Sequence, residues 1–85
     1  MQNEKFTTHL FFTGGTHHKE APITGDKLAS VITRVCDGPA AVMGIIERAL
    51  IVDSSDRICI EIKGRDIVFP PALAAQQKAF RTQSK

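Results

Sequence analysis

Apolar residues follow a helical period through the middle of the chain. Within residues 26–36 they fall three or four positions apart, at Leu28, Val31, Ile32, Val35 and Cys36. This spacing puts them on one stripe of a helix, with polar residues on the opposite side. Gly38 and Pro39 interrupt the pattern, since glycine supplies a flexible stop and proline suits the first turn of a following helix. We therefore predict a first helix that ends near Asp37.

The same spacing resumes after the break and predicts a second helix over residues 39–50. Its apolar positions are Val42, Ile45, Ile46, Ala49 and Leu50. Small residues at positions 40, 41 and 44 permit the close approach of another backbone. The two stretches together predict a pair of helices whose apolar stripes face one core.

A strand-like stretch, residues 6–13, precedes the helical region. It consists mostly of aromatic and β-branched residues, which favour strands. Alternation along a strand separates its side chains into two faces. The face assigned to the core carries Phe6, Leu10 and Phe12, and the other carries Thr7, His9 and Phe11.

Gly14 and Gly15 end this strand, and residues 16–24 are predicted to form a long surface loop. Loops longer than a few residues often serve a function in small domains. The candidate functional residues of this loop are His17, His18 and Lys19.

A second alternating stretch, residues 57–63, predicts another strand. Ile58, Ile60 and Ile62 are assigned to the core, and Cys59, Glu61 and Lys63 to the opposite face. Gly64-Arg65 fits a two-residue turn that opens with glycine, so residues 66–69 are expected to return as the antiparallel partner. This region therefore predicts a β-hairpin.

The end of the chain combines helix-forming residues with a thin apolar stripe. Pro71 suits a first helical turn, and only Leu73, Gln77 and Phe80 line one side of the predicted helix. We predict one α+β domain over residues 1–85, ordered strand, helix, helix, strand, strand, helix, with an antiparallel sheet packed against the helical pair. Residues 1–5 are expected to be a frayed lead-in, and residues 70–85 a loosely docked helix with a basic tail.

The net charge of +2 and the 42% of apolar residues are ordinary for a globular protein. Lys78, Arg81 and Lys85 give the last ten residues a charge of +3, leaving 8 basic and 9 acidic residues in the rest of the chain. The basic character therefore belongs to the tail. No apolar run approaches the length of a membrane span, and no signal-peptide pattern opens the chain, so we expect a cytoplasmic protein.

No residue pattern indicates a metal site, a cofactor or a catalytic group. The histidines and cysteines lack the paired spacings that bring two metal ligands together. Cys36 and Cys59 fall in predicted core elements, where we expect reduced thiols, although a disulfide between them is left open. The carboxylates are spread singly along the chain. We therefore expect neither an enzyme nor a cofactor-binding protein.

The predicted order of elements suggests nucleic-acid binding as an alternative function. Two helices followed by a hairpin resemble in outline a helix-turn-helix with a β-wing, as in DNA-binding regulators. The predicted second helix, however, offers only Glu47 and Arg48 to reach base edges. Nucleic acid is therefore disfavoured as a partner.

Protein binding is the function that we favour from the sequence. We expect a stoichiometric inhibitor, adaptor or regulator of a larger protein, of the size common among phage and mobile-element accessory proteins that act against bacterial defence. A homodimer is an open alternative. The predicted partner-binding residues are Thr7, His9, Phe11, Glu61 and Lys63. They place an aromatic residue among polar ones, which is the composition of an interface centre. Alternatively, the last helix could fold back and cover Phe11.

Overall fold

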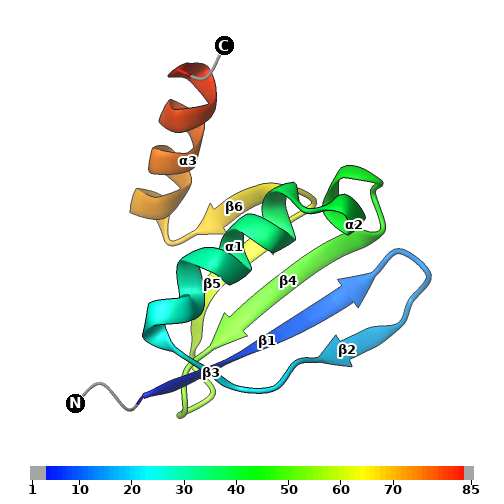
Figure 1. The fold of residues 1–85 in the computed structure, drawn as a ribbon, viewed down its shortest axis with the longest axis vertical. Coiled ribbons are helices and arrows are strands. Elements are labelled where there is room, and N and C mark those ends of the chain that lie inside the picture. The colour runs from blue at the N-terminus through cyan, green and yellow to red at the C-terminus, as the bar shows by residue number, and fades with distance from the viewer. Residues whose placement is uncertain (1–3, 84–85) are drawn as a thin grey trace.

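A central antiparallel sheet organises the computed structural model, which describes residues 4–83 (Figure 1). The strands are β1 (Lys5–Phe12), β2 (His17–Lys19), β3 (Ile23–Thr24), β4 (Ile46–Val52), β5 (Ile58–Lys63) and β6 (Asp66–Phe69). The helices are α1 (Leu28–Asp37), α2 (Pro39–Val42) and α3 (Pro71–Gln83), and a short 3-10 turn, η1 (Gly25–Lys27), leads into α1. The small α+β domain predicted from the sequence is confirmed.

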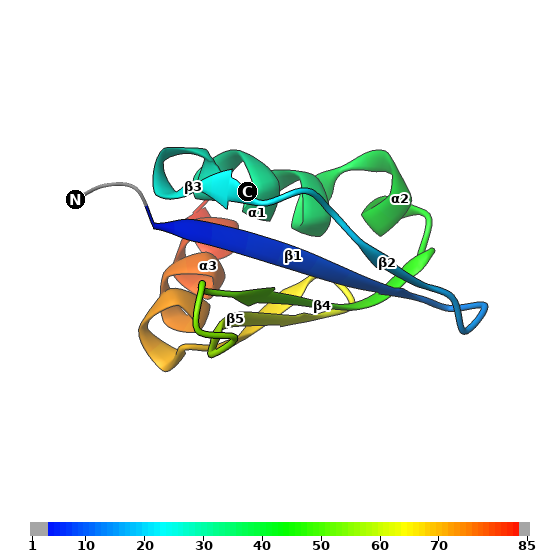
Figure 2. The same cartoon turned by 90° about the horizontal axis from the view of Figure 1, so that it is seen from below.

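The strands follow the spatial order β2-β1-β4-β5-β6, and β3 pairs with the start of β1 on the same side as β2. α1 and α2 lie over one face of this sheet (Figure 2). α3 lies beside β6, at the end of the sheet farthest from β2 (Figure 1). The second face of the sheet is therefore left uncovered by helices in the described residues.

The hydrophobic core lies between α1 and the sheet. Val35, Ile51 and Ile62 are fully buried there, joined by Leu10 and other small aliphatic side chains. The predicted core assignments hold for α1, where Leu28 and Ile32 pack partly buried beside Val31, Val35 and Cys36. Two isoleucines expected in the core lie outside it, because Ile45 is 40% exposed and Ile58 is 48% exposed.

The predicted second helix is wrong beyond its first turn. α2 ends at Val42, Gly44 adopts a φ of +76°, and β4 begins at Ile46. A β-bulge explains the misleading spacing, since Phe11 pairs with Arg48 while Phe12 pairs with Ile46. The extra residue lets Ile46 and Ala49, three positions apart, both point into the core. The bulge thereby imitates a helical period in a strand.

The predicted loop over residues 16–24 is also corrected. It contains two short strands, β2 and β3, both paired with β1. The three side chains of β2 are all exposed. The strand therefore lacks the alternation of apolar and polar residues from which a strand is predicted. Of the predicted lead-in, residues 1–3 lie outside the described residues, and Lys5 already belongs to β1.

The hairpin of β5 and β6 is confirmed. Lys63 pairs with Asp66 across the two-residue turn, and Gly64 takes the positive φ of +61° that such a turn requires at its first position. α3 begins at Pro71, as predicted, and Leu73 and Ala74 pack against the core. Lys85 of the predicted basic tail lies outside the described residues.

Candidate functional site

Two rows of side chains cross the uncovered face of the sheet, which we call the open face. Directly paired residues of antiparallel strands point to the same side of a sheet. One row consists of the paired positions His17, Phe11, Arg48, Lys63 and Asp66. The neighbouring row consists of Lys19, His9, Leu50, Glu61 and Phe69. These side chains alternate with the buried ones beneath α1 and thus face away from the helices.

The open face brings together the residues predicted to bind a partner: Thr7, His9, Phe11, Glu61 and Lys63. The residues of β1 are separated from those of β5, because β4 lies between the two strands. Arg48 and Leu50 of β4 therefore occupy the centre of the surface. The sequence analysis did not place either residue on this face, since both fell in the predicted second helix.

Phe11 is held between two neighbours on the open face. The ring of His17 stacks on it with a centroid separation of 4.7 Å and an interplanar angle of 8°. The guanidinium carbon of Arg48 lies 5.1 Å from the centre of the Phe11 ring, within range of a cation–π interaction. Arg48 also pairs with Glu61 at 3.8 Å. Phe11 is thereby half-buried and ordered without a helix over it.

His9 and His17 form a hydrogen-bonded imidazole pair beside Phe11. His9 Nδ1 lies 3.1 Å from His17 Nε2, so one ring donates a hydrogen bond to the other. The ring centroids are 5.3 Å apart, and the planes of the two rings differ by 21°. The N–H of one ring therefore faces the lone pair of the other.

His17 and His18 lie on opposite faces of the sheet. His18 pairs with Leu10 and so belongs to the side of the helices, whereas Lys19 pairs with His9 on the open face. Of the three candidate loop residues, two therefore join the predicted surface and one does not.

α3 does not cover Phe11. Its partner in the sheet is β6, and β1 and β6 are separated by β4 and β5. Leu73 packs against the core, and Phe80 is 68% exposed along the groove between α1 and α3. The alternative in which the last helix folds over Phe11 is therefore wrong.

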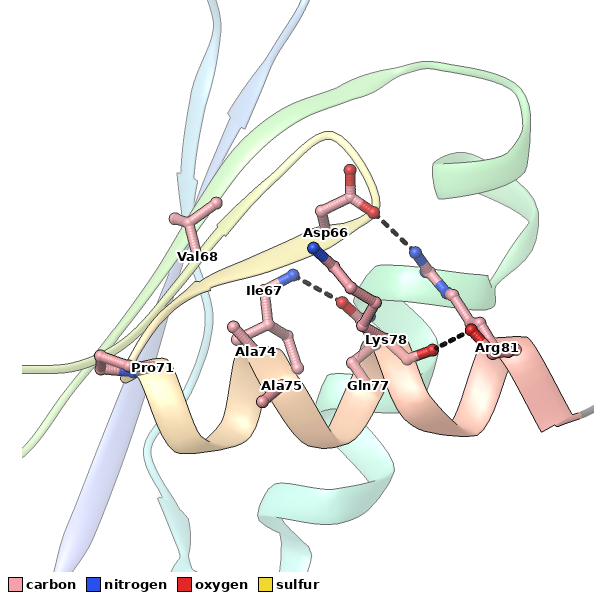
Figure 3. A pocket seen from close by; sticks show the side chains of 10 residues that line it. Asp66, Ile67, Val68, Pro71, Ala74, Ala75, Gln77, Lys78 and Arg81 are labelled. Carbon is pink, nitrogen blue, oxygen red and sulfur yellow. Dashed lines mark hydrogen bonds and ion pairs between the residues drawn. The ribbon is translucent and has the colours of Figure 1, made fainter.

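Side chains of α3 bind the outer edge of β6 (Figure 3). Gln77 Oε1 accepts a hydrogen bond from the Ile67 backbone N–H at 2.8 Å, and Gln77 Nε2 donates to the Arg65 carbonyl at 3.1 Å. Arg81 donates to the same carbonyl at 2.7 Å and pairs with Asp66 at 2.6 Å. Gln77 thus takes the place of a neighbouring strand.

The two cysteines are free thiols. Burial raises the pKa of the Cys36 thiol and also that of the Cys59 thiol. A raised pKa keeps a thiol protonated at neutral pH, and the protonated form is a poor nucleophile and metal ligand. Neither cysteine belongs to the rows that cross the open face.

The helix-turn-helix outline is not formed. α2 is four residues long, and the stretch expected to present a recognition helix is strand β4. Within residues 4–83, no group of three or more histidine, cysteine or acidic side chains is placed to hold a metal ion. Among the described helices, none combines the length and apolar character that a membrane crossing requires.

The fold and the open face define a small α+β domain with an exposed, aromatic-centred sheet surface. Comparison of the chain with protein-family models, curated proteins and solved structures gives no match.

Proposed function

We propose that this protein is a non-enzymatic binding module that docks on a larger protein through the open face and acts stoichiometrically as an inhibitor, adaptor or regulator. The observation that carries the proposal is Phe11, ordered by His17 and Arg48 on a surface without a covering helix. Aromatic and arginine side chains dominate the energetics of protein interfaces. A side chain that is already ordered loses less conformational entropy on binding.

The surroundings of Phe11 fit the rest of an interface. Leu50 extends the apolar centre, and the polar side chains of Thr7, Lys19, Glu61 and Lys63 surround it. Interface centres of this type exclude water from the anchor while a polar rim provides orientation. For the biological setting, we propose a cytoplasmic accessory protein of the phage or mobile-element type, directed against a bacterial defence component.

The proposal is tested by affinity capture from a nuclease-treated bacterial lysate with the parent chain and Phe11→Asp. We expect the parent to retain one protein in stoichiometric amount and Phe11→Asp to lose it, because a carboxylate at the anchor cannot be desolvated. Phe80→Asp is the matched control, since it changes an exposed aromatic residue on α3 and should retain the partner.

Thermal melts of the same variants decide whether the loss is local. Melting temperatures of the parent and Phe11→Asp that agree within a few degrees assign the loss to the surface. Retention of the partner by Phe11→Asp, or a large fall in its melting temperature, would contradict the proposed anchor.

A further inference from the structure

The two edge strands of the sheet, β6 and β2, differ in whether other parts of the chain bind their outer backbone groups. The β6 edge is occupied, because Gln77 accepts the Ile67 N–H, and Gln77 and Arg81 both donate to the Arg65 carbonyl in the turn just before β6. At the opposite end, β2 is the terminal strand, and no further strand of the described residues pairs with it. An uncovered edge strand presents backbone groups on which another extended chain can pair.

Hydrogen bonds across β1 and β2 show which groups of β2 point outward. The Phe12 N–H bonds to the carbonyl of Thr16, and the Glu20 N–H bonds to the carbonyl of Thr8. Residues 16, 18 and 20 therefore turn their backbone groups toward β1, since these groups alternate in direction along a strand. The N–H and C=O groups of His17 and Lys19 point away from the sheet.

Positive charge accompanies this edge. Lys19 is exposed on the open face and makes no ion pair with the described residues. Glu20, the nearest acid along the chain, is already bound by Arg34 through contacts of 2.6 and 3.1 Å. The Glu20 carboxylate is therefore paired with Arg34 of α1 and does not neutralise the charge of Lys19.

We propose that the partner contributes an extended segment with carboxylate side chains, which adds to the β2 edge as a further strand. Its backbone bonds to His17 and Lys19, and its acidic side chain faces Lys19 on the open face, beside His9. This inference rests on the proposed function and names the mode of docking. A second copy of the chain is a poorer occupant, because paired β2 strands would place like charges close together.

The test uses a synthetic, end-blocked peptide of alternating valine and glutamate, and a control peptide with lysine in place of glutamate. We expect the glutamate peptide to bind the full chain at low salt, and the lysine peptide to bind about tenfold more weakly or not at all. Affinity for the glutamate peptide should fall as salt rises, because the charges at the edge are exposed.

Two substitutions at one position separate the backbone from the charge. Lys19→Gln removes the charge alone, whereas Lys19→Pro also removes the outward N–H and blocks the approaching strand. Proline is tolerated on edge strands where the N–H faces solvent, so β2 should keep its pairing with β1. We expect Lys19→Gln to weaken binding severalfold and Lys19→Pro to abolish it. In the parent chain, amide exchange at His17 and Lys19 should slow when the peptide binds.

Three outcomes would overturn strand addition: equal affinity of Lys19→Pro and Lys19→Gln, unprotected amides at His17 and Lys19, or equal binding of both peptides. A parent dimer in sedimentation that Lys19→Pro dissociates would assign the edge to a second copy and also overturn it. A partner that depends on Phe11 but still binds Lys19→Pro would refute strand addition at β2 alone. The proposed function as a binding module would be unaffected.

Discussion

Asp53 organises the connection between β4 and β5 through a single carboxylate oxygen. Asp53 Oδ1 accepts the backbone N–H of Ser55 at 2.8 Å and that of Arg57 at 3.0 Å. The turn also holds Asp56 in the left-handed region with a φ of 65°. The hydrogen bond from Arg57, followed by that from Ser55, lowers the pKa of the Asp53 carboxyl below its ordinary value of 3.8.

This lowered pKa predicts an acid-side dependence of stability. Because the folded-state pKa lies below the unfolded one, the contribution of Asp53 is full above the unfolded pKa and is lost as pH falls through the folded value. Asp53→Asn keeps an acceptor oxygen but cannot titrate. We therefore expect the difference in melting temperature between parent and Asp53→Asn, measured from neutral pH to about pH 2, to shrink with acidification. A constant difference would contradict the assignment.

Residues of the open face were predictable from the sequence only where strand alternation was intact. Thr7, His9 and Phe11 in β1, and Glu61 and Lys63 in β5, were assigned to one face by alternation alone. The contact of Phe11 with Arg48 and His17 depends on the register between strands that the sequence did not indicate. The alternation of residues along one strand predicts the face on which a side chain lies. Its neighbours on that face depend on the pairing between strands.

At the scale of elements, the sequence predicted those that carry a complete local signal. α1 has an uninterrupted apolar stripe, and the β5–β6 hairpin has its glycine at the turn. β4 was mistaken for a helix because its bulge opposite Phe11 and Phe12 shifts the period of its buried residues. β2 and β3 are too short for any period to be visible.

The apolar stripe of α3 does not show how the helix is held against the rest of the domain. Its stripe is thin, yet the two ends of the Gln77 amide bond to the backbone of Ile67 in β6 and of Arg65 in the turn before it. A polar side chain such as Gln77, which bonds to an edge strand in place of another strand, cannot be recognised from the pattern of apolar residues. Polar contacts of this kind satisfy an edge that would otherwise be unpaired.

Gln77→Ala should therefore destabilise the domain. It leaves the part-buried N–H of Ile67 without its acceptor, whereas the Arg65 carbonyl keeps its bond from Arg81. We expect a loss of about 1–3 kcal/mol in the free energy of unfolding, measured by urea denaturation. The neighbouring Gln76→Ala changes an exposed side chain and should stay within about 0.5 kcal/mol of the parent. Equal effects of the two substitutions would refute a specific role for Gln77.

For the whole molecule, the two ends of the sheet define two different surfaces. The β2 end is open and carries Lys19 with His17, whereas the β6 end is closed by α3. Val68 and Phe69 lie at the closed end and are 45% and 43% exposed. At this end α3 therefore covers part of the backbone edge of β6 and leaves these two apolar side chains partly exposed.

Truncation after Phe69 tests this view of the closed edge. The shortened chain keeps α1 and β1–β6 and should still melt cooperatively, since the fully buried side chains all lie in the retained part. It loses Leu73, Ala74 and Gln77 and should melt at a lower temperature. It also exposes the backbone of β6 next to Val68 and Phe69, so we expect concentration-dependent association in sedimentation, absent from the full chain. A truncated chain that stays monomeric with an unchanged melt would show that α3 is not what protects this edge.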